Sequence, residues 1–350
     1  MNSSKISLNG RLIGSGEPCF IIAEVGQAHD GSLGMAHSYI DVAADIGVDA
    51  IKFQTHIASS ESTLNEEFRI NFSLQDRIRF DYWRRMEFSS EQWAGLAEHA
   101  RKRDLIFLSS AFSLQAVDML KNIGMPAWKI GSGELSNESL LRAICSTGQP
   151  ILLSTGMSDY ASIEKAVNFV KAQGVDICLF QCTSKYPVPL SNIGLNVMVD
   201  LGQKFGCPVG LSDHSGSIYP ALAAMALDAS LIEAHIVFDR RMFGPDTSSS
   251  LMPDEFLCLT KARDAFHEMK SNPVNKNSIA CNLSEMRSLF GRSVALVSDM
   301  PRGTVLSADM LTLKKPGNGI SEECMVSLIG RRLQRDVTSE YLLTWDDIDG

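Results

Sequence analysis

Short apolar runs alternate along the chain with longer segments in which apolar residues recur every three or four positions. The longer segments, such as LGMAHSYIDVAADIG and SSEQWAGLAEHARKR, have the period of helices with one buried face. The runs are CFIIAE, DAIKFQ, LIFLSS, AWKIGS, PILLST, DICLFQ, PVGLSD and SLIEAHIVF. Eight strands alternating with helices over about 250 residues predict a (β/α)8 TIM barrel. A doubly wound open sheet is the alternative, but it usually begins with a glycine-rich turn, and no GxGxxG follows the first run.

The pattern changes after Met269. The segment KSNPVNKNSIACNLSE is polar and has no clear apolar periodicity, which is typical of a linker. Beyond it, GRSVALVSDMPRGTVLSADMLTLKKPGNGI and IGRRLQRDVTSEYLLTWDDI share a Gly-Arg opening, an apolar strand and a turn. We therefore expect a barrel domain over residues 1–270, a linker over 271–288 and a small β-rich domain over 289–350.

Composition narrows the class of protein. The 350 residues are 45% hydrophobic, which suits a globular core, and the net charge is -9 with no block of Lys or Arg. Because proteins bind nucleic acids mostly through cations on phosphates, this balance argues against a nucleic-acid partner. No segment has the pattern of a signal peptide or a membrane span, so we expect a cytoplasmic protein. The eight cysteines, with no CxxC pair, are expected to be reduced core residues.

Polar residues gather where the predicted strands end, which is where active sites form in (β/α)8 barrels. Lys52 and Lys129 lie within apolar strands, and burying an unpaired ammonium is costly. Each lysine could face solvent, but hydroxyls follow at the strand ends Ser132, Ser154 and Ser212. Ammonium and hydroxyl donors together favour a site for a phosphate or carboxylate group.

Two histidines, His214 and His235, end consecutive predicted strands and would lie side by side in a closed barrel. A histidine at such a position can be a structural residue, or it can be a ligand of a divalent transition metal. If both bind a metal, positions stay open for water and substrate, and Asp213 or Glu233 could orient an imidazole. The spacing alone leaves the structural and the metal-binding hypotheses open.

The segment from Thr55 to Phe88 is too long for a simple strand-to-helix connection. A segment of this length in a barrel can be a lid or a specificity element. It can equally be an extra helix on the rim, and the sequence does not separate these interpretations.

Motifs at nearly every strand end resemble those of the sialic acid (N-acetylneuraminate, or nonulosonate) synthase family. They are FIIAEVGQAHDGSLGMA, DAIKFQTH, PAWKIGSGE, PILLSTGMS, LFQCTSKYPVP, GLSDHSGS, EAHIVFDR and MFGPDTSSSL, followed by KKPGNG. The C-terminal part is similar to the SAF (antifreeze-like) domain of that family. The resemblance runs in order from about Phe20 to the end of the chain.

The resemblance implies an enzyme that condenses phosphoenolpyruvate with the open-chain aldehyde of a 2-acetamido hexose. The acceptor would be N-acetylmannosamine or a diacetamido-trideoxy analogue, and the products a nine-carbon 2-keto sugar acid and phosphate. It also implies a divalent metal, Mn2+ or alternatively Co2+ or Mg2+, and a homodimer in which the C-terminal domain closes the acceptor site of the partner.

Carried over position by position, the resemblance assigns roles to fourteen residues. The implied metal ligands are His214 and His235, which count as catalytic together with Glu24 and Glu134. The residues matched to phosphoenolpyruvate binding are Lys52, Ser110, Lys129, Ser132, Ser154 and Ser212. The residues matched to acceptor binding are Gln54, Tyr186, Asp246 and Lys315, with Glu24 and Glu134 lining the same sugar.

Three positions depart from the family pattern. Ala28 replaces an Asn, Ser110 replaces a Thr, and Lys315 stands where an Arg is common, so the acceptor sugar stays open. One rival is another phosphoenolpyruvate-aldehyde synthase, making 8-carbon or 7-carbon keto acid phosphates. Its acceptor would carry a phosphate, whereas the acceptor-side residues here are mainly acidic or neutral. A second rival is a carbohydrate-binding or ice-binding protein with an inactive barrel.

Overall fold

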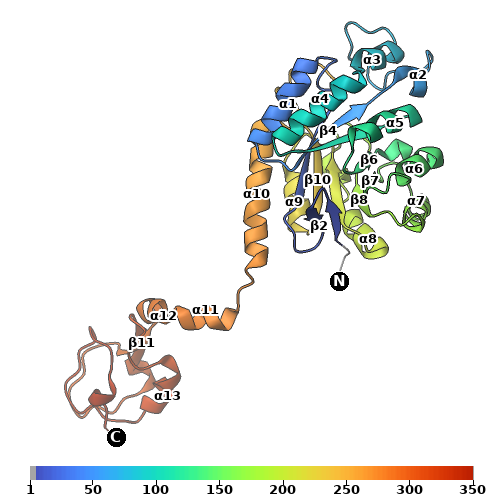
Figure 1. Cartoon of the computed structure of the whole chain (residues 1–350). Coiled ribbons are helices and arrows are strands. Elements are labelled where there is room, and N and C mark those ends of the chain that lie inside the picture. The colour runs from blue at the N-terminus through green and yellow to red at the C-terminus, as the bar shows by residue number, and fades with distance from the viewer. Residues whose placement is uncertain (1–4, 350) are drawn as a thin grey trace. The chain divides into compact units, whose positions relative to one another are not determined.

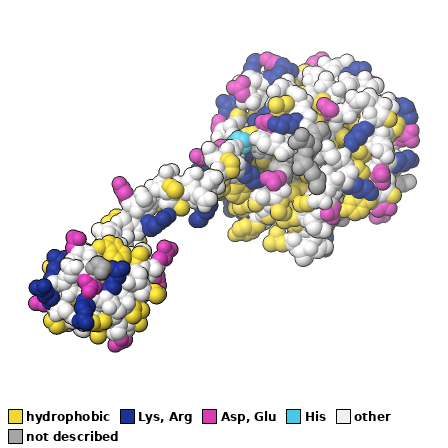
Figure 2. Space-filling model, turned by 90° about the horizontal axis from the view of Figure 1, so that it is seen from below, with side chains coloured by type: hydrophobic (Ala, Val, Ile, Leu, Met, Phe, Trp, Pro, Cys, Tyr) yellow, Lys and Arg dark blue, Asp and Glu magenta, His cyan; other side chains and the backbone are white. Residues whose placement is uncertain are grey.

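The structure, a computed structural model, describes residues 5–349 and divides into two compact units. The first unit ends at Ser271 and the second begins at Asn272. On the face of the first unit shown in Figure 2, Lys and Arg side chains are interspersed with Asp and Glu. Among residues 5–349, no helix combines the length and the apolar character needed to span a bilayer.

The first unit is a closed barrel of eight parallel strands, surrounded by helices (Figure 1). The strands are β3 (Phe20–Gly26), β4 (Ala50–Thr55), β5 (Ile106–Ala111), β6 (Trp128–Ile130), β7 (Ile151–Ser154), β8 (Ile177–Gln181), β9 (Val209–Asp213) and β10 (Leu231–His235). They pair in chain order, and β10 pairs with β3 to close the barrel. The predicted TIM barrel is confirmed, and each strand coincides with one of the eight apolar runs.

A helix follows each barrel strand before the next strand begins. These helices are α1 (Leu33–Asp45), α4 (Ser90–Lys102), α5 (Leu114–Ile123), α6 (Glu138–Cys145), α7 (Tyr160–Ala172), α8 (Leu195–Phe205), α9 (Tyr219–Ala226) and α10 (Pro253–Ser271). Local sequence sets where they begin: Ser89 and Gln92 form a capping box at the start of α4, and Asp159 caps α7. Two short helices, α2 (Ala58–Glu61) and α3 (Arg79–Met86), lie in the long segment between β4 and α4.

The barrel interior changes from apolar to charged along the strands. Because side chains alternate across a strand, Ile22 and Glu24 share the inward face of β3, as Leu231, Glu233 and His235 share that of β10. The apolar layers include Phe20, Ala50, Leu108, Leu152, Cys178 and Phe180. The hairpin of β1 (Ile6–Leu8) and β2 (Arg11–Ile13) packs against these layers and covers the end where the strands begin. The charged layer is therefore left at the opposite end.

The second unit has its own small core around an antiparallel pair, β11 (Ser293–Leu296) and β12 (Leu311–Lys314). The α-helices of this unit are α11 (Lys276–Asn282), α12 (Ser284–Phe290) and α13 (Met325–Leu328). The segment 271–288, expected to be a linker, thus contains the last residue of α10, all of α11 and most of α12. Apart from β11 and β12, the paired backbone in this unit consists of isolated bridges such as Met300 with Val337.

All eight cysteines have free thiols, as expected. Five of them are buried, but Cys258 and Cys281 are exposed, so the expectation that all are core residues was wrong for these two. Cys258 stands in an apolar stretch of α10, yet it lies on the outer face of that helix. The apolar residues beside Cys258 in the sequence did not show which face of the helix this residue occupies.

Candidate active site

Two buried lysines meet one carboxylate at the mouth of the barrel, where the strands end. The Nζ atom of Lys129 lies 3.2 Å from Oε1 of Glu233, and that of Lys52 lies 3.7 Å from Oε2 of the same residue. All three residues are no more than 3% exposed. Each lysine comes from a different strand and each points inward, because Lys52 and Lys129 occupy inward positions of β4 and β6. The arrangement offers two ammonium groups beside a single shared counter-ion.

Glu24 completes the pairing of Lys52. The Nζ atom of Lys52 donates to Oε1 of Glu24 at 2.5 Å, and Nε2 of Gln54 donates to the same oxygen at 2.7 Å. Burial alone would raise the pKa of the Glu24 carboxyl, but the Lys52 ammonium holds that pKa well below its usual range. Burial would lower the pKa of Lys52, but Glu233 and Glu24 raise it above its ordinary value. Both members of the pair therefore stay charged at neutral pH.

Hydroxyl groups surround the lysines. Ser154 accepts a hydrogen bond from Nζ of Lys129 at 2.7 Å, and Ser212 donates to Oε1 of Glu233 at 3.0 Å. The Oγ atom of Ser110 lies 3.5 Å from Nζ of Lys52. Ser132 lies apart from these contacts and instead exchanges a hydrogen bond with Ser184 at 2.9 Å. Three of the four predicted serines thus contact the lysine and glutamate group directly.

His214 and His235 lie beside one another at the same mouth, with ring centroids 5.5 Å apart. Nδ1 of His214 lies 3.2 Å from the carbonyl oxygen of Thr183, which can only accept, so Nδ1 carries the proton and Nε2 keeps a lone pair. Burial and the neighbouring His235 lower the pKa of His214 to about 3, so its imidazole is neutral. A neutral imidazole with a free nitrogen fits a metal ligand.

Within residues 5–349, no cluster of three or more His, Cys, Asp or Glu side chains is arranged to hold a metal ion. The expectation that Asp213 or Glu233 orients an imidazole was wrong. Asp213 accepts from the backbone and hydroxyl of Ser215, which fixes the turn after β9, and Glu233 is engaged by the lysines and Ser212.

A cavity of about 410 Å3 opens over this mouth. Its lining includes the predicted acceptor residues Gln54, Tyr186 and Asp246, together with Ser132, Glu134 and His235. The ring of Tyr186 lies 4.2 Å from that of His214, centroid to centroid, and burial raises the pKa of the Tyr186 phenol, which keeps its proton. Glu134 accepts from the side chain of Asn137 at 2.7 Å. Lys315 belongs to the second unit, where its ammonium lies 5.4 Å from the centroid of the Phe290 ring.

The segment from Thr55 to Phe88 builds the outer wall of this cavity. Its lining residues are Glu61, Glu66, Phe68, Arg69, Ile70, Phe72, Arg79, Tyr82 and Trp83. Arg69 joins the wall to the barrel, because its Nη2 atom donates to Asp246 at 2.7 Å and its guanidinium lies 4.1 Å from the centroid of the Tyr186 ring. The segment carries two short helices, as one interpretation expected, and it also lines the cavity; its role as a lid or specificity element stays a prediction.

Two residues of this site were not assigned their roles from sequence. Glu233 was noted at a strand end but not as the counter-ion of both lysines, although its place two residues before His235 puts it on the same inward face. Arg69 was not singled out, because it lies in an irregular stretch where no periodicity relates it to Asp246. Alternation along β10 could have found Glu233, whereas no comparable signal exists for Arg69.

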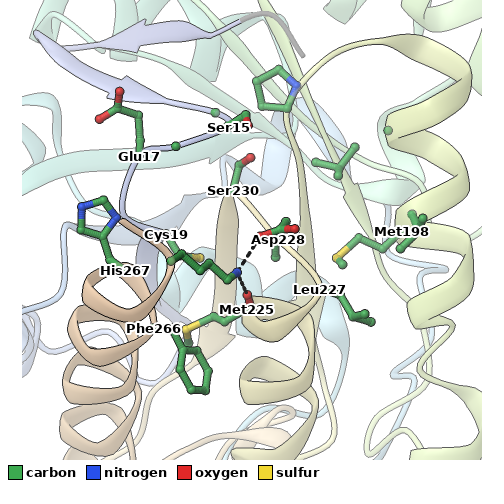
Figure 3. Close-up of a pocket in the computed structure, with 18 of the residues that line it drawn as sticks. Ser15, Glu17, Cys19, Met198, Met225, Leu227, Asp228, Ser230, Phe266 and His267 are labelled. Atoms are coloured by element: carbon green, nitrogen blue, oxygen red, sulfur yellow. Dashed lines mark hydrogen bonds and ion pairs between the residues drawn. The ribbon is translucent and has the colours of Figure 1, made fainter. Parts of the chain in front are cut away.

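A larger cavity, of about 760 Å3, lies at the opposite end of the barrel (Figure 3). Cys19, Ser230 and Asp228 lie just before the strands β3 and β10, and Phe266 and His267 come from α10. This cavity contains none of the residues predicted to be functional.

Comparison with known proteins places the chain in a family. Residues 39–274 match the model of the NeuB family and residues 291–349 that of the SAF domain. The N,N'-diacetyllegionaminic acid synthase of Campylobacter jejuni subsp. jejuni serotype O:2 is 33% identical, over 92% of this chain and 98% of that protein. The N-acetylneuraminate-9-phosphate synthase of Homo sapiens is 32% identical, over 97% of this chain and 95% of that protein.

Among solved structures, the N-acetylneuraminic acid (sialic acid) synthetase of Leptospira borgpetersenii serovar Hardjo-bovis superimposes with a TM-score of 0.72. It is 31% identical and covers 82% of this chain and 98% of its own. The barrel, the charged mouth, the family matches and these relatives together show that the chain is a synthase of the NeuB family, the nonulosonic acid synthases, with a C-terminal SAF domain.

Proposed function

We propose that this enzyme condenses phosphoenolpyruvate with the open-chain aldehyde of a 2-acetamido hexose, giving a nine-carbon 2-keto sugar acid and inorganic phosphate. The observation that carries the proposal is the convergence of buried Lys52 and Lys129 on Glu233, next to the His214 and His235 pair and beneath the cavity. Buried charges of this kind are costly and are typical of sites that bind and transform charged substrates.

The lysines and serines would hold the donor. Ammonium groups of Lys52 and Lys129 bind the phosphate and carboxylate of phosphoenolpyruvate, and the hydroxyls of Ser110, Ser132, Ser154 and Ser212 add directed hydrogen bonds. Their shared counter-ion, Glu233, keeps both ammoniums in one orientation before the donor arrives. This arrangement orients the enol carbon toward the aldehyde, which lowers the entropic part of the activation barrier.

A divalent metal held by His214 and His235, Mn2+ or alternatively Co2+ or Mg2+, would polarise the aldehyde oxygen as a Lewis acid. Thr183 keeps the His214 ring in the orientation and tautomer that a ligand needs. Gln54, Tyr186 and Asp246 would hold the sugar chain from the barrel side of the cavity. In a homodimer with exchanged C-terminal domains, Lys315 would reach the acetamido end of the acceptor.

The bond changes balance without a further co-reactant. The C3 carbon of phosphoenolpyruvate forms a bond to the aldehyde carbon, whose C=O π bond opens while its oxygen takes up a proton. Water adds at C2, and the bond from C2 to the phosphate oxygen then breaks, which releases phosphate and leaves the C2 ketone. Two carboxylates lie near enough to the mouth to take the proton of that water. Glu24 is kept ionised by Lys52, and Glu134 lines the cavity.

The proposal is tested by phosphate release from phosphoenolpyruvate, with mass detection of the sugar product. Metal-stripped protein is assayed with and without Mn2+ on unphosphorylated acetamido hexoses and on phosphorylated tetroses and pentoses. Metal-dependent release with an acetamido hexose and a nine-carbon product is expected. Phosphate release with a phosphorylated tetrose or pentose alone would contradict the proposal and favour the rival synthases. Absence of phosphate release with every acceptor would favour a barrel that only binds carbohydrate.

A further inference from the structure

Two histidines meet on the outside of the barrel, between the helices α1 and α4, which pack side by side (Figure 1). His37 lies on α1 and His99 on α4, and their Nδ1 atoms are 2.8 Å apart. Both side chains are partly exposed, so an ion can reach these nitrogens from solvent. We propose that this α1–α4 histidine pair binds a divalent transition-metal ion of the kind that imidazole prefers, such as Zn2+. The pair is separate from the cavity at the barrel mouth and does not depend on the proposed function.

The hydrogen bonds of the pair determine which nitrogens can bind a metal. Nε2 of His99 lies 3.1 Å from Oδ1 of Asp41, and an ionised carboxylate only accepts, so Nε2 carries the proton and Nδ1 of the neutral ring keeps its lone pair. Nδ1 of His37 then donates to that lone pair. Among residues 5–349, Nε2 of His37 has no hydrogen-bond partner, so the ring proton can move there and leave a second lone pair at Nδ1.

The spacing of the pair fits a single ion. Zinc binds imidazole nitrogens at about 2.0–2.1 Å in tetrahedral geometry, which places two such nitrogens about 3.3 Å apart. The two Nδ1 atoms, at 2.8 Å, need to separate by only about half an ångström for a metal to replace the shared proton. Burial and the neighbouring His99 lower the pKa of His37 despite the opposing effect of Asp41, which favours the neutral ring that a metal requires. Water completes the coordination, because no cluster of three ligand residues forms among residues 5–349.

Asp41 orients the pair and is not itself a ligand. Its Oδ1 atom faces Nε2 of His99 and also lies 3.2 Å from Nε of Arg103. A carboxylate that holds the second nitrogen of a metal-binding histidine fixes the ring and raises its basicity. Because the protein then offers nitrogen rather than oxygen, the site favours Zn2+, Ni2+ and Cu2+ over Mn2+ and Mg2+. This selectivity distinguishes it from the Mn2+ site proposed for the barrel mouth.

The first test counts the Zn2+ ions that the full-length protein binds per chain in equilibrium dialysis. His37→Gln and His99→Gln should each bind one Zn2+ fewer than the unsubstituted protein, and their circular-dichroism spectra should show that the fold is kept. The control is His267→Gln, at a partly exposed histidine of α10, which should bind as many ions as the unsubstituted protein. An unchanged count in His37→Gln, or the same loss in His267→Gln, would overturn the site.

The second test measures the Zn2+ affinity of the pair alone, by calorimetric titration of the full-length His214→Ala, His235→Ala double variant. Adding Asp41→Asn should weaken binding about 10- to 100-fold, the usual effect of losing a carboxylate that orients a metal-binding histidine. The matched control is Asp45→Asn. Asp45 lies one turn further along α1 and pairs with the same Arg103, at 2.6 Å, so its loss should change the affinity less than about twofold. Equal effects of the two substitutions, or tighter binding of Mn2+ than of Zn2+, would contradict the assignment of the ligands.

Discussion

The two ends of the barrel differ in a way that volume does not reveal. The cavity at the beginnings of the strands has about 760 Å3, against about 410 Å3 at the mouth. Yet the lysine of the larger cavity, Lys270, has 44% of its side chain exposed and pairs with Asp228, which is 83% exposed. At the mouth, Lys52 and Glu233 are each 2% exposed. An ion pair that stays solvated costs little desolvation free energy, whereas a buried ion pair is stable only when neighbouring groups hold it in place.

Burial of charge, rather than the size of the cavity, therefore distinguishes the end of the barrel at which we propose that the reaction takes place. Figure 3 shows sulfur and apolar side chains, among them Met198, Met225 and Phe266, around the larger cavity. The dashed contacts drawn there are those of Lys270 with Asp228 and with the backbone oxygen of Met225, at 2.6 Å and 2.7 Å. These contacts tie α10 to the end of α9 and explain the lysine without a ligand. Matched substitutions at the two ends of the barrel test whether they differ in function.

The largest difference is expected for the histidines. His214→Ala or His235→Ala should lower kcat/KM about 1,000-fold or more, because Lewis-acid stabilisation by a metal amounts to several kcal/mol. The variants should also lose the rise in melting temperature that Mn2+ gives the unsubstituted protein, since a ligand that binds the folded state stabilises it. Activity and thermal unfolding with and without Mn2+ measure the two effects.

The control is His267→Ala, a histidine that lines the cavity at the opposite end. It should keep both the activity and the stabilisation by Mn2+. Full activity in His214→Ala, or loss of stabilisation by Mn2+ in His267→Ala, would contradict the assignment of the metal to the mouth.

A smaller but still large effect is expected for the lysines. Lys129→Ala should lower kcat/KM about 100- to 1,000-fold, the loss typical of one preorganised electrostatic contact. It also leaves Glu233 with Lys52 as its remaining cation, so steady-state kinetics should be accompanied by a melting temperature to show that the fold survives. Lys270→Ala, the matched lysine of the larger cavity, should change kcat/KM less than about twofold, as expected for an exposed pair. Comparable losses in both variants would mean that the two ends do not differ as described.

Much of this fold follows from the sequence because it depends on local patterns. Apolar runs of strand length located all eight strands, and alternation along them placed Lys52 and His235 on inward faces. What the sequence did not provide are relations between side chains from separate strands or loops. Glu233 sits between two lysines that are more than a hundred residues away in the chain, and Arg69 reaches Asp246 from an irregular segment. Such pairings depend on how the barrel closes, so no local pattern encodes them.

The same limit explains the error on Asp213 and why the helices of the segment 271–288 were not foreseen. A carboxylate next to a histidine in sequence looks suited to orient it, but the tight turn after β9 directs Asp213 to Ser215 instead. The segment 271–288 lacks a clear apolar stripe, yet α11 and α12 form there, and Asn275 caps the first of them. Short capped helices need little periodicity, so the low amphipathicity of this segment did not reveal that it is helical; its role as a linker stays a prediction.

The smallest expected effect concerns stability rather than catalysis and comes from His29, near the mouth. Its side chain is fully buried, accepts a hydrogen bond from the backbone N–H of Gly31 at 3.1 Å, and packs 4.8 Å from Phe88, centroid to centroid. Burial, together with the smaller effects of the nearby His56 and Arg85, lowers the pKa of His29 from 6.5 to about 3. Between these values the unfolded chain binds a proton that the folded chain does not, so stability is full above pH 6.5 and falls as the pH drops toward 3.

At pH 5 this histidine should cost about 2 kcal/mol of the stability present at pH 7, since each unit of pKa difference corresponds to 1.36 kcal/mol. His29→Asn keeps an acceptor for the Gly31 N–H but does not titrate, so it should flatten the loss. Urea unfolding followed by tryptophan fluorescence at pH 7 and pH 5 measures it, with His267→Asn as the control at the opposite end. An equal fall in stability for the unsubstituted protein and His29→Asn would show that the buried histidine does not set acid sensitivity. The barrel mouth would then owe its acid response to other groups, and the contrast between its ends would rest on the lysine and metal sites alone.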